Sequence, residues 1–200
     1  HIEQIIQELS ENNQIKKIAF SAAIALLQAI GTTQYSLGYQ IPLNVMFKIT
    51  TSLHKQSSDF GLDAKTIGKS LHSLQAFDIS CESTKSLMRE LTILMNSSHM
   101  ELNAYEISHA CFGIHKIGCD PSSKELVNSL TALLEKSSAV FDENSIAMSC
   151  FSLASLDPMD QSTKDYVKII ATKIGSSLTT LDGDSISKAL YGMRKLSSSC

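Results

Sequence analysis

The side chains best suited to metal chemistry gather in one short stretch. It holds His109, Cys111, His115 and Cys119, whose nitrogen and sulfur atoms are ligands that zinc prefers. The last three of these residues recur at every fourth position, so on a helix they would stack along one face. A structural zinc ion instead needs four ligands that converge as a tetrahedron, usually from two elements. We therefore expect no metal site here, and we expect His115 to lie exposed beside a turn.

The other arrangements that support catalysis are not found in the sequence. There is no G-x-S-x-G nucleophile elbow, and no Gly-rich or Walker motif that would cradle a phosphate. Most of the conspicuous carboxylates stand where a helix would begin, a position that they favour for structural reasons. These observations predict a protein that is not an enzyme and has no cofactor and no small-molecule substrate.

Composition narrows the class of protein further. The net charge of −3 argues against a strongly basic surface for nucleic acid, and 43% hydrophobic with 18% charged residues is ordinary for a globular chain. No apolar run approaches the roughly 18 residues of a membrane span, so we expect no membrane insertion. Because the chain starts at His1 rather than Met, we expect a fragment or processed form that lacks its targeting segment.

A sixteen-residue pattern recurs along the chain. It occupies residues 62–77, 102–117, 141–156 and 181–196. The same position holds an isoleucine in each copy, and these anchors are separated by 40, 39 and 40 residues: Ile67, Ile107, Ile146 and Ile186. A constant period of this length is typical of stacked helical repeats.

Each copy carries the signals of a helix N-terminus. The expected N-cap residues are Asp63, Asn103, Asp142 and Asp182. An apolar residue precedes each cap and would pack on the anchor isoleucine as a hydrophobic staple, and Glu106 completes a capping box with Asn103. A second set of caps, at Ser80, Asp120 and Asp160, predicts a second helix in each copy. Each copy is thus a helical hairpin.

The expected architecture is all-α: a right-handed α-solenoid of about five helix-turn-helix repeats with a period near 40 residues. The hairpins span about 14–61, 62–101, 102–140, 141–180 and, truncated, 181–200, and residues 1–10 are the remnant of a preceding repeat. In the first hairpin we expect helices at 14–30 and 42–56, joined by a loop from Gly31 to Gln40.

Helical spacing divides the first helix of each repeat into layers. The positions equivalent to 67, 70, 71 and 74 form an apolar stripe that we assign to the core. Cys111 and Cys150 belong to this stripe, where other copies have leucine, so we expect buried thiols rather than a disulfide, in a reducing compartment. The positions equivalent to 68 and 73 are almost all small, which would allow neighbouring first helices to approach closely.

The remaining positions are candidates for ligand binding. One column is aromatic or imidazole in every copy: His72, Phe112, Phe151 and Tyr191. These rings either fill the groove between adjacent first helices or offer stacking platforms to bases. Beside them lie positions that vary between copies: Lys65, Lys69, Tyr105, His109, Asn144, Met148, Asp184 and Lys188. They are either the base-reading side chains of a modular RNA-binding protein or unconstrained surface positions.

The repeat resembles the octotricopeptide and related heptatricopeptide-like repeats. The resemblance is carried by the pattern at 181–196, which reads Leu-Asp-x-x-x-Ile-Ser-x-Ala-Leu-Tyr-Gly-Met-x-x-Leu, and by the capped second helix that follows this pattern in the earlier copies. The resemblance covers roughly residues 14–200. It implies an organellar protein that binds single-stranded RNA along one face, with first-helix side chains reading the bases. HEAT and armadillo repeats also have a suitable period, whereas tetratricopeptide repeats, at about 34 residues, fit less well.

Two functions follow from these patterns. The first is a non-catalytic RNA-binding protein of a mitochondrion or plastid that supports RNA processing, stability or translation. The alternative is a protein-interaction scaffold or an architectural subunit of a larger assembly. A continuous positive path over the positions equivalent to 65, 69 and 72 would favour RNA, and a large apolar patch there would favour a protein partner.

Overall fold

The computed structural model describes residues 2–11, 19–37, 43–56, 63–97, 100–117 and 120–196. These residues form ten α-helices and two short 3-10 turns, Leu74–Ala76 and Leu153–Ser155, and contain no strand. The helices are α1 (Ile2–Glu11), α2 (Phe20–Leu37), α3 (Leu43–Gln56), α4 (Ala64–Ser73), α5 (Glu82–Ser97), α6 (Ala104–Ile114), α7 (Pro121–Lys136), α8 (Glu143–Ser152), α9 (Gln161–Gly175) and α10 (Gly183–Met193). The expected all-α class is confirmed, and none of these helices is long and apolar enough to cross a membrane.

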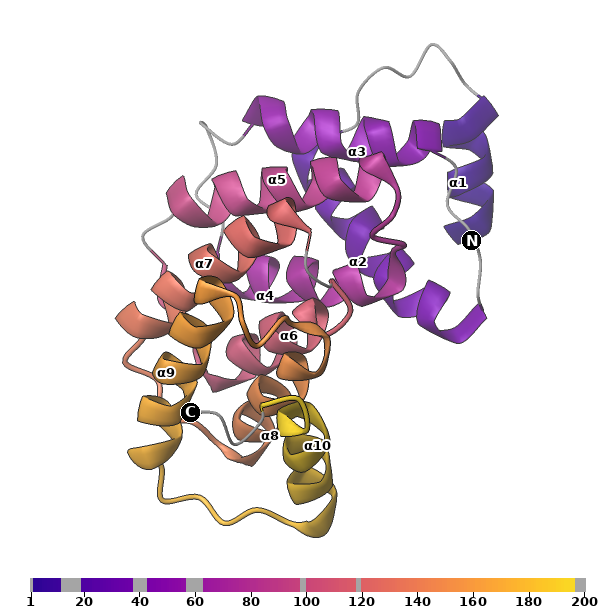
Figure 1. The fold of residues 1–200 in the computed structure, drawn as a ribbon. Coiled ribbons are helices and arrows are strands. Elements are labelled where there is room, and N and C mark those ends of the chain that lie inside the picture. Colours follow the sequence, from indigo (N-terminus) through magenta and orange to yellow (C-terminus); the bar gives the residue numbers. More distant parts are fainter. Residues whose placement is uncertain are drawn as a thin grey trace.

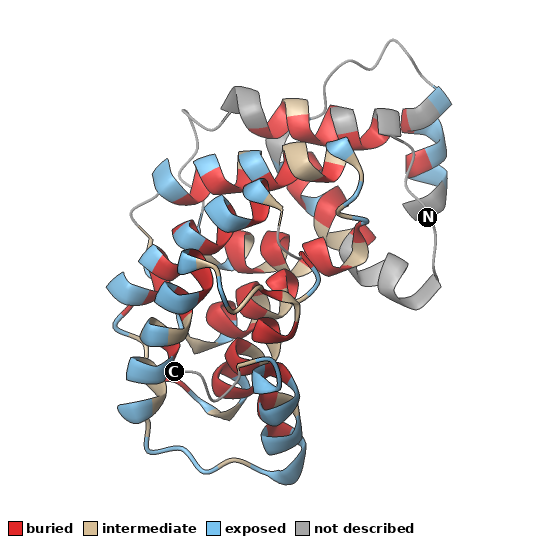
Figure 2. Cartoon of the chain, in the orientation of Figure 1, coloured by how far each residue is buried: buried red, intermediate tan, exposed pale blue. Residues whose placement is uncertain are grey.

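The helices pack as two rows. The even-numbered helices α2, α4, α6, α8 and α10 contact one another in that order, and the odd-numbered helices α1, α3, α5, α7 and α9 do the same. Figure 1 shows the rows side by side, with the colour passing from indigo to yellow along them. One hydrophobic core extends from Ile6 to Ala189, and Figure 2 shows its buried residues concentrated where the rows meet. The even row corresponds to the predicted first helices and the odd row to the second helices.

The predicted N-caps of the first helices are confirmed. The side chains of Asp63, Asn103, Asp142 and Asp182 each accept a hydrogen bond from the backbone N–H three residues later. The carboxylate of Glu106 in turn accepts a hydrogen bond from the N–H of Asn103, so the capping box is present as well. These caps satisfy N–H groups that the helix itself leaves unpaired.

The second helices follow the prediction less closely. Asp120 caps α7 with its side chain, whereas Asp160 stands at the cap of α9 without a side-chain cap bond. The prediction of Ser80 as the cap of α5 is wrong, because that helix begins one residue later and Cys81 occupies the position before it. The N–H of Ser80 instead bonds the carboxylate of Asp78, which ties Ser80 into the preceding turn.

The helix α2 differs from the expected boundaries. It begins at Phe20, while residues 14–18 of the predicted helix lie outside the described residues. It continues to Leu37, so the expected loop from Gly31 is wrong over 31–37, and residues 38–40 are not among those described. A single glycine inside a helix costs only about 1 kcal/mol relative to alanine, which the neighbouring turns can offset.

The core stripe is confirmed in three first helices, whereas in the fourth only its Ala189 is buried. Its members on α4, α6 and α8 are all buried. On α10, Ile186 is 44% exposed and Leu190 is 62% exposed. The physical reason is that α4, α6 and α8 each contact the second helix that follows them, whereas no second helix follows α10 among the described residues.

The small residues allow neighbouring first helices to touch through their backbones. A Cβ atom added at Gly113 would lie 1.9 Å from the carbonyl oxygen of Leu71, and one added at Gly192 would lie 1.8 Å from that of Cys150. Such distances are far inside van der Waals contact, so only glycine fits at either position. The predicted close approach of the first helices is therefore confirmed.

Candidate binding face of the first helices

The variable residues and the rings lie together along one side of the even row, which we call the first-helix face. Lys65, Tyr105, Asn144, Asp184 and Tyr191 are exposed. The others are half-buried: Lys69, His72, His109, Phe112, Met148, Phe151 and Lys188. The N-terminal caps fix the start of each helix, and glycine contacts hold α6 close to α4 and α10 close to α8.

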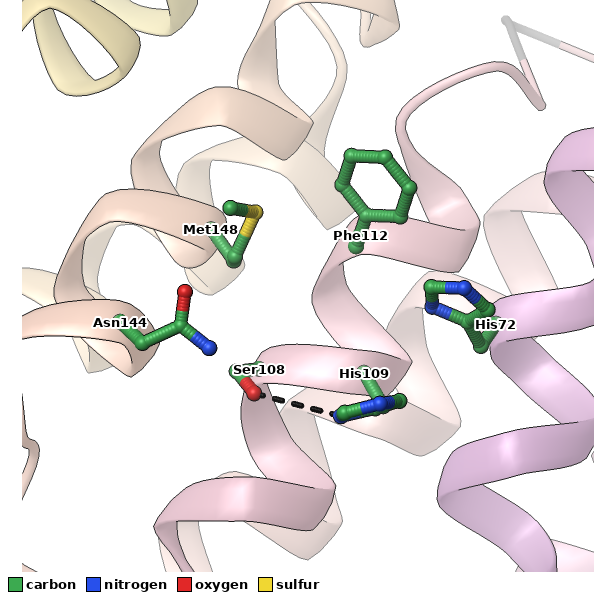
Figure 3. Close-up of a pocket in the computed structure, with 6 residues that line it drawn as sticks. All are labelled: His72, Ser108, His109, Phe112, Asn144 and Met148. Carbon is green, nitrogen blue, oxygen red and sulfur yellow. Dashed lines mark hydrogen bonds between the residues drawn. The ribbon is translucent and has the colours of Figure 1, made fainter. Parts of the chain in front are cut away.

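The structure brings five of the predicted residues into one open pocket of about 230 Å³. Its lining comes from three successive first helices: His72, Ser108, His109, Phe112, Asn144 and Met148. Figure 3 shows Asn144 and Met148 of α8 opposite His72 of α4, with α6 between them. The sequence pattern predicts only helix packing for Ser108. No local signal distinguishes Ser108 from the other small positions, because the hollow depends on side chains from different repeats.

The polar groups of the pocket are only partly engaged. The Oγ of Ser108 donates to the carbonyl of Tyr105 at 2.8 Å, and Nδ1 of His109 lies 2.9 Å from the same oxygen. The Nδ1 of His72 is buried and has no hydrogen-bond partner. Among the described residues the exposed amide of Asn144 has no hydrogen-bond partner either. That amide can donate one hydrogen bond and accept another from a ligand.

The rings form a continuous stack that we call the aromatic column. His72 stacks on Phe112 with centroids 5.2 Å apart, and Phe151 stacks on Tyr191 at 5.5 Å. Phe112 and Phe151 are 6.0 Å apart, and His115 stacks against both, at 5.6 and 4.6 Å. The rings therefore pack on one another between adjacent first helices, as one of the two interpretations predicted.

His115 corrects a further expectation. We expected it to be exposed beside a turn, and it does stand at the C-cap of α6. Its ring is nevertheless half-buried within the aromatic column. It follows Phe112 by three residues, and residues three apart are neighbours on a helix surface.

The column leaves few ring faces for a base. Both ends carry half-exposed tyrosines: Tyr105 packs on His109 at 4.1 Å, and the guanidinium of Arg194 lies 3.7 Å from the ring centre of Tyr191. The interior rings are stacked against neighbours. Because Tyr191 contacts both Phe151 and Arg194, the column leaves few ring faces as stacking platforms. The pocket offers ring edges and polar groups instead.

Charge is spread unevenly over the first-helix face. The pKa of His72 is lowered chiefly by burial and further by the charge of His109. The pKa of His115 is lowered chiefly by burial and further by the charge of Lys116. Both imidazoles are therefore neutral near pH 7. Lys65 and Lys69 place positive charge on α4, whereas on α10 Lys188 pairs with Asp184. The residues that α8 contributes, Asn144 and Met148, are neutral. The positive path is therefore not continuous.

The buried thiols are structural. Cys111 accepts hydrogen bonds from the hydroxyl of Tyr166 at 3.1 Å and from Ser149 at 3.4 Å. Burial raises the pKa of the Cys111 thiol, and burial together with Cys111 raises the pKa of Cys150 to about 11. Both are free and buried, as predicted. Across the described part of the chain no three His, Cys, Asp or Glu side chains could hold a metal ion, and Cys119 lies outside that part.

Comparisons with protein-family models, with curated protein sequences and with solved structures find no match for this chain. The function of the chain must therefore be inferred from the first-helix face. It combines one open pocket, one closed stack of rings and two lysines at the α4 end.

Proposed function

We propose that the chain is a non-catalytic α-solenoid, a right-handed array of helical hairpins, that binds single-stranded RNA along the first-helix face. The observation that carries this proposal is the pocket between α4, α6 and α8, where variable residues of α6 and α8 meet the His72 ring of α4. A modular RNA-binding protein varies the residues that contact bases while its framework stays constant. The resemblance to octotricopeptide repeats supports the same function and an organellar location.

The pocket fits a single nucleobase better than a larger ligand. Drug-sized ligands occupy pockets of about 300–1,000 Å³, whereas a cavity of about 150 Å³ holds benzene. A base in this pocket would lie against the thioether of Met148 and the ring of Phe112 and would exchange hydrogen bonds with the amide of Asn144. Lys65 and Lys69 stand on the adjoining helix α4, where they would contact phosphates.

Because α4 contributes two lysines and α8 none, we expect modest affinity with a shallow salt dependence. Two phosphate contacts with single-stranded RNA give a slope of log K against log salt of about −1.4. The test is an anisotropy titration with random-sequence single-stranded RNA at several salt concentrations. We expect K65E/K69E to abolish salt-dependent binding and N144A to weaken binding severalfold.

The matched control is K168E, which reverses an exposed charge on α9, in the other row of helices. It should bind RNA as the parent chain does. If the parent chain shows no salt-dependent affinity, or if K168E weakens binding as much as K65E/K69E does, the RNA-binding proposal fails.

The second candidate function is a protein-interaction scaffold or architectural subunit. The observation that favours it is the neutral middle of the first-helix face, where α8 presents Asn144 and Met148 without a lysine or arginine nearby on that helix. On this alternative, the aromatic column is packing only and the pocket receives a partner's side chain. If K65E/K69E binds RNA as tightly as the parent chain does, the first-helix face is not the RNA-binding surface. The scaffold function is then the better candidate.

A further inference from the structure

Two polar side chains of the pocket between α4, α6 and α8 have their protons engaged by one backbone oxygen. Oγ of Ser108 lies 2.8 Å from the carbonyl oxygen of Tyr105, and Nδ1 of His109 lies 2.9 Å from it. Because a carbonyl oxygen can only accept, both contacts use the proton of the side chain. In the neutral imidazole Nε2 of His109 then carries no proton. Oγ of Ser108 and Nε2 of His109 are therefore acceptors towards a ligand.

The rest of the lining adds a single donor. His72 offers no free nitrogen, because its Nε2 lies 2.8 Å from the amide nitrogen of Gln75 and its Nδ1 is buried. Phe112 and Met148 contribute only apolar surface. Figure 3 shows the amide of Asn144 directed from α8 toward the polar side chains of α6. Nδ2 of this amide is thus the only hydrogen-bond donor that the lining side chains offer to a ligand, and acceptors predominate.

Nucleobases differ in what they present to such a surface. Adenine and cytosine carry an exocyclic amino group, which donates two hydrogen bonds, beside a ring nitrogen that accepts one. The amino group would donate to Oδ1 of Asn144 and to Nε2 of His109, while the ring nitrogen accepts from Nδ2 of Asn144. Uracil carries a carbonyl oxygen in place of the amino group, so it would set an acceptor against the acceptors of His109 and Ser108.

We propose that this pocket selects bases that carry an exocyclic amino group and disfavours uracil. The proposal rests on the RNA-binding function proposed above and names the bases that the pocket accepts. Asn144 is then the residue that determines specificity, because its amide contacts both the amino group and the adjacent ring nitrogen. His109 adds the second acceptor, and the side chains of Phe112 and Met148 hold the ring of the base.

The test compares fluorescein-labelled octamers of cytidine and of uridine by anisotropy at pH 8, where an ordinary imidazole is neutral. The two octamers have the same phosphate charge and the same ring size, so their affinity ratio reports the base alone. We expect the cytidine octamer to bind about fivefold more tightly, the lower end of the range for a bidentate base contact, because the pocket is open to solvent. Raising the salt concentration should weaken both octamers equally.

Variants of the pocket should change this ratio. N144A should bring it close to one, and H109F, which keeps a ring beside Tyr105 but removes the acceptor, should lower it. N128A is the matched control, because it removes the same amide from an exposed position on α7, in the other row of helices. It should leave the ratio unchanged. Circular dichroism establishes that each variant is folded.

A second pair of octamers tests the amino group without changing the protein. Purine riboside has hydrogen in place of the amino group of adenosine, so its octamer should bind severalfold more weakly. Equal affinity within either pair, with salt-dependent binding retained, would overturn base selection and leave RNA binding intact. Base selection is also overturned if N144A keeps the preference for cytidine or if N128A loses it. If no octamer shows salt-dependent binding, the RNA-binding proposal fails and base selection fails with it.

Discussion

At the scale of single residues, two glycines set the distance between neighbouring first helices. Gly113 faces the backbone of Leu71, and an alanine Cβ would lie 1.9 Å from its carbonyl oxygen. The helices α4 and α6 would have to move apart, and overpacking of this kind costs typically 1–3 kcal/mol. We expect Gly113→Ala to lower the free energy of unfolding by about 2 kcal/mol, measured by chemical denaturation.

The control for this change is Gly183→Ala in the first turn of α10, where an added Cβ meets nothing within 4 Å. Alanine restricts the unfolded chain more than glycine does, so this variant should be neutral or more stable by under about 1 kcal/mol. Equal destabilisation by both alanine variants would show that helix contact is not the cause.

Protonation of the column histidines should oppose folding. Burial chiefly lowers the pKa of His72 and His115 below the ordinary value of about 6.5, with the charges of His109 and Lys116 acting in the same direction. In the window between the lowered and ordinary values the unfolded chain binds more protons. Stability is therefore fully present above about pH 6.5 and is lost as the pH falls through the lowered values.

The variant His115→Phe keeps a ring between Phe112 and Phe151 but cannot be protonated. We expect a smaller drop in the free energy of unfolding between about pH 7.5 and pH 5.5 than in the parent chain, measured by urea denaturation at both values. An unchanged drop would mean that His115 does not contribute to acid destabilisation.

At the scale of the helix, the same repeat position has opposite environments in α8 and α10. Ile146 is 4% exposed, whereas Ile186 is 44% exposed. Ile146→Asp removes a buried side chain and places a carboxylate in the core, so it should cost about 3 kcal/mol or more. Ile186→Asp should cost under about 1 kcal/mol. Thermal or urea denaturation of the two variants compares them directly, and similar losses would refute the assigned helix phase.

Much of each helix could be predicted from local signals. The caps at Asp63 and Asn103, the apolar stripe and the small positions can each be recognised from a few neighbouring residues. Each of these signals also occurs in several repeats. The failures have tertiary causes. Ile186 carries the same local pattern as Ile146, but within the described residues no second helix covers it.

The candidate site was predictable as a face but not as a cavity. Helix periodicity places His72, Phe112 and Phe151 in one column, and the structure shows that column to be closed by ring stacking. The three-residue spacing from Phe112 makes His115 a neighbour of the column, but its contact with Phe151 depends on a side chain from the next repeat. No spacing rule indicates that Ser108, Asn144 and Met148 surround an open volume, because that depends on side chains from different repeats.

At the scale of the whole molecule, hydrogen bonds cross from one repeat to the next inside the core. The hydroxyl of Tyr166 on α9 bonds the thiol of Cys111 on α6 and lies 2.9 Å from Oγ of Ser152 on α8. Ser155 also donates to the carbonyl of Ile114. These bonds satisfy buried polar groups, which are costly to leave unpaired, and they connect α6, α8 and α9 into one unit.

Because contacts run mainly between neighbouring helices of a row, stability should vary along the molecule. The helix α10 packs on α8 and on the turn that follows it, whereas α6 has a first helix on each side. In arrays coupled through neighbours, local opening spreads from the ends. We expect faster amide hydrogen exchange in residues 183–193 than in residues 104–114, measured by mass spectrometry.

The variant Gly192→Ala tests that coupling, because an added Cβ would lie 1.8 Å from the carbonyl oxygen of Cys150 on α8. It should accelerate exchange in α10 strongly and in α8 less, and leave α4 unchanged, because α4 contacts α6 rather than α8. A uniform acceleration across all helices would mean that the chain opens as a single cooperative unit. A rise confined to α10 and α8 would mean that each helix is held chiefly by its neighbours in the row.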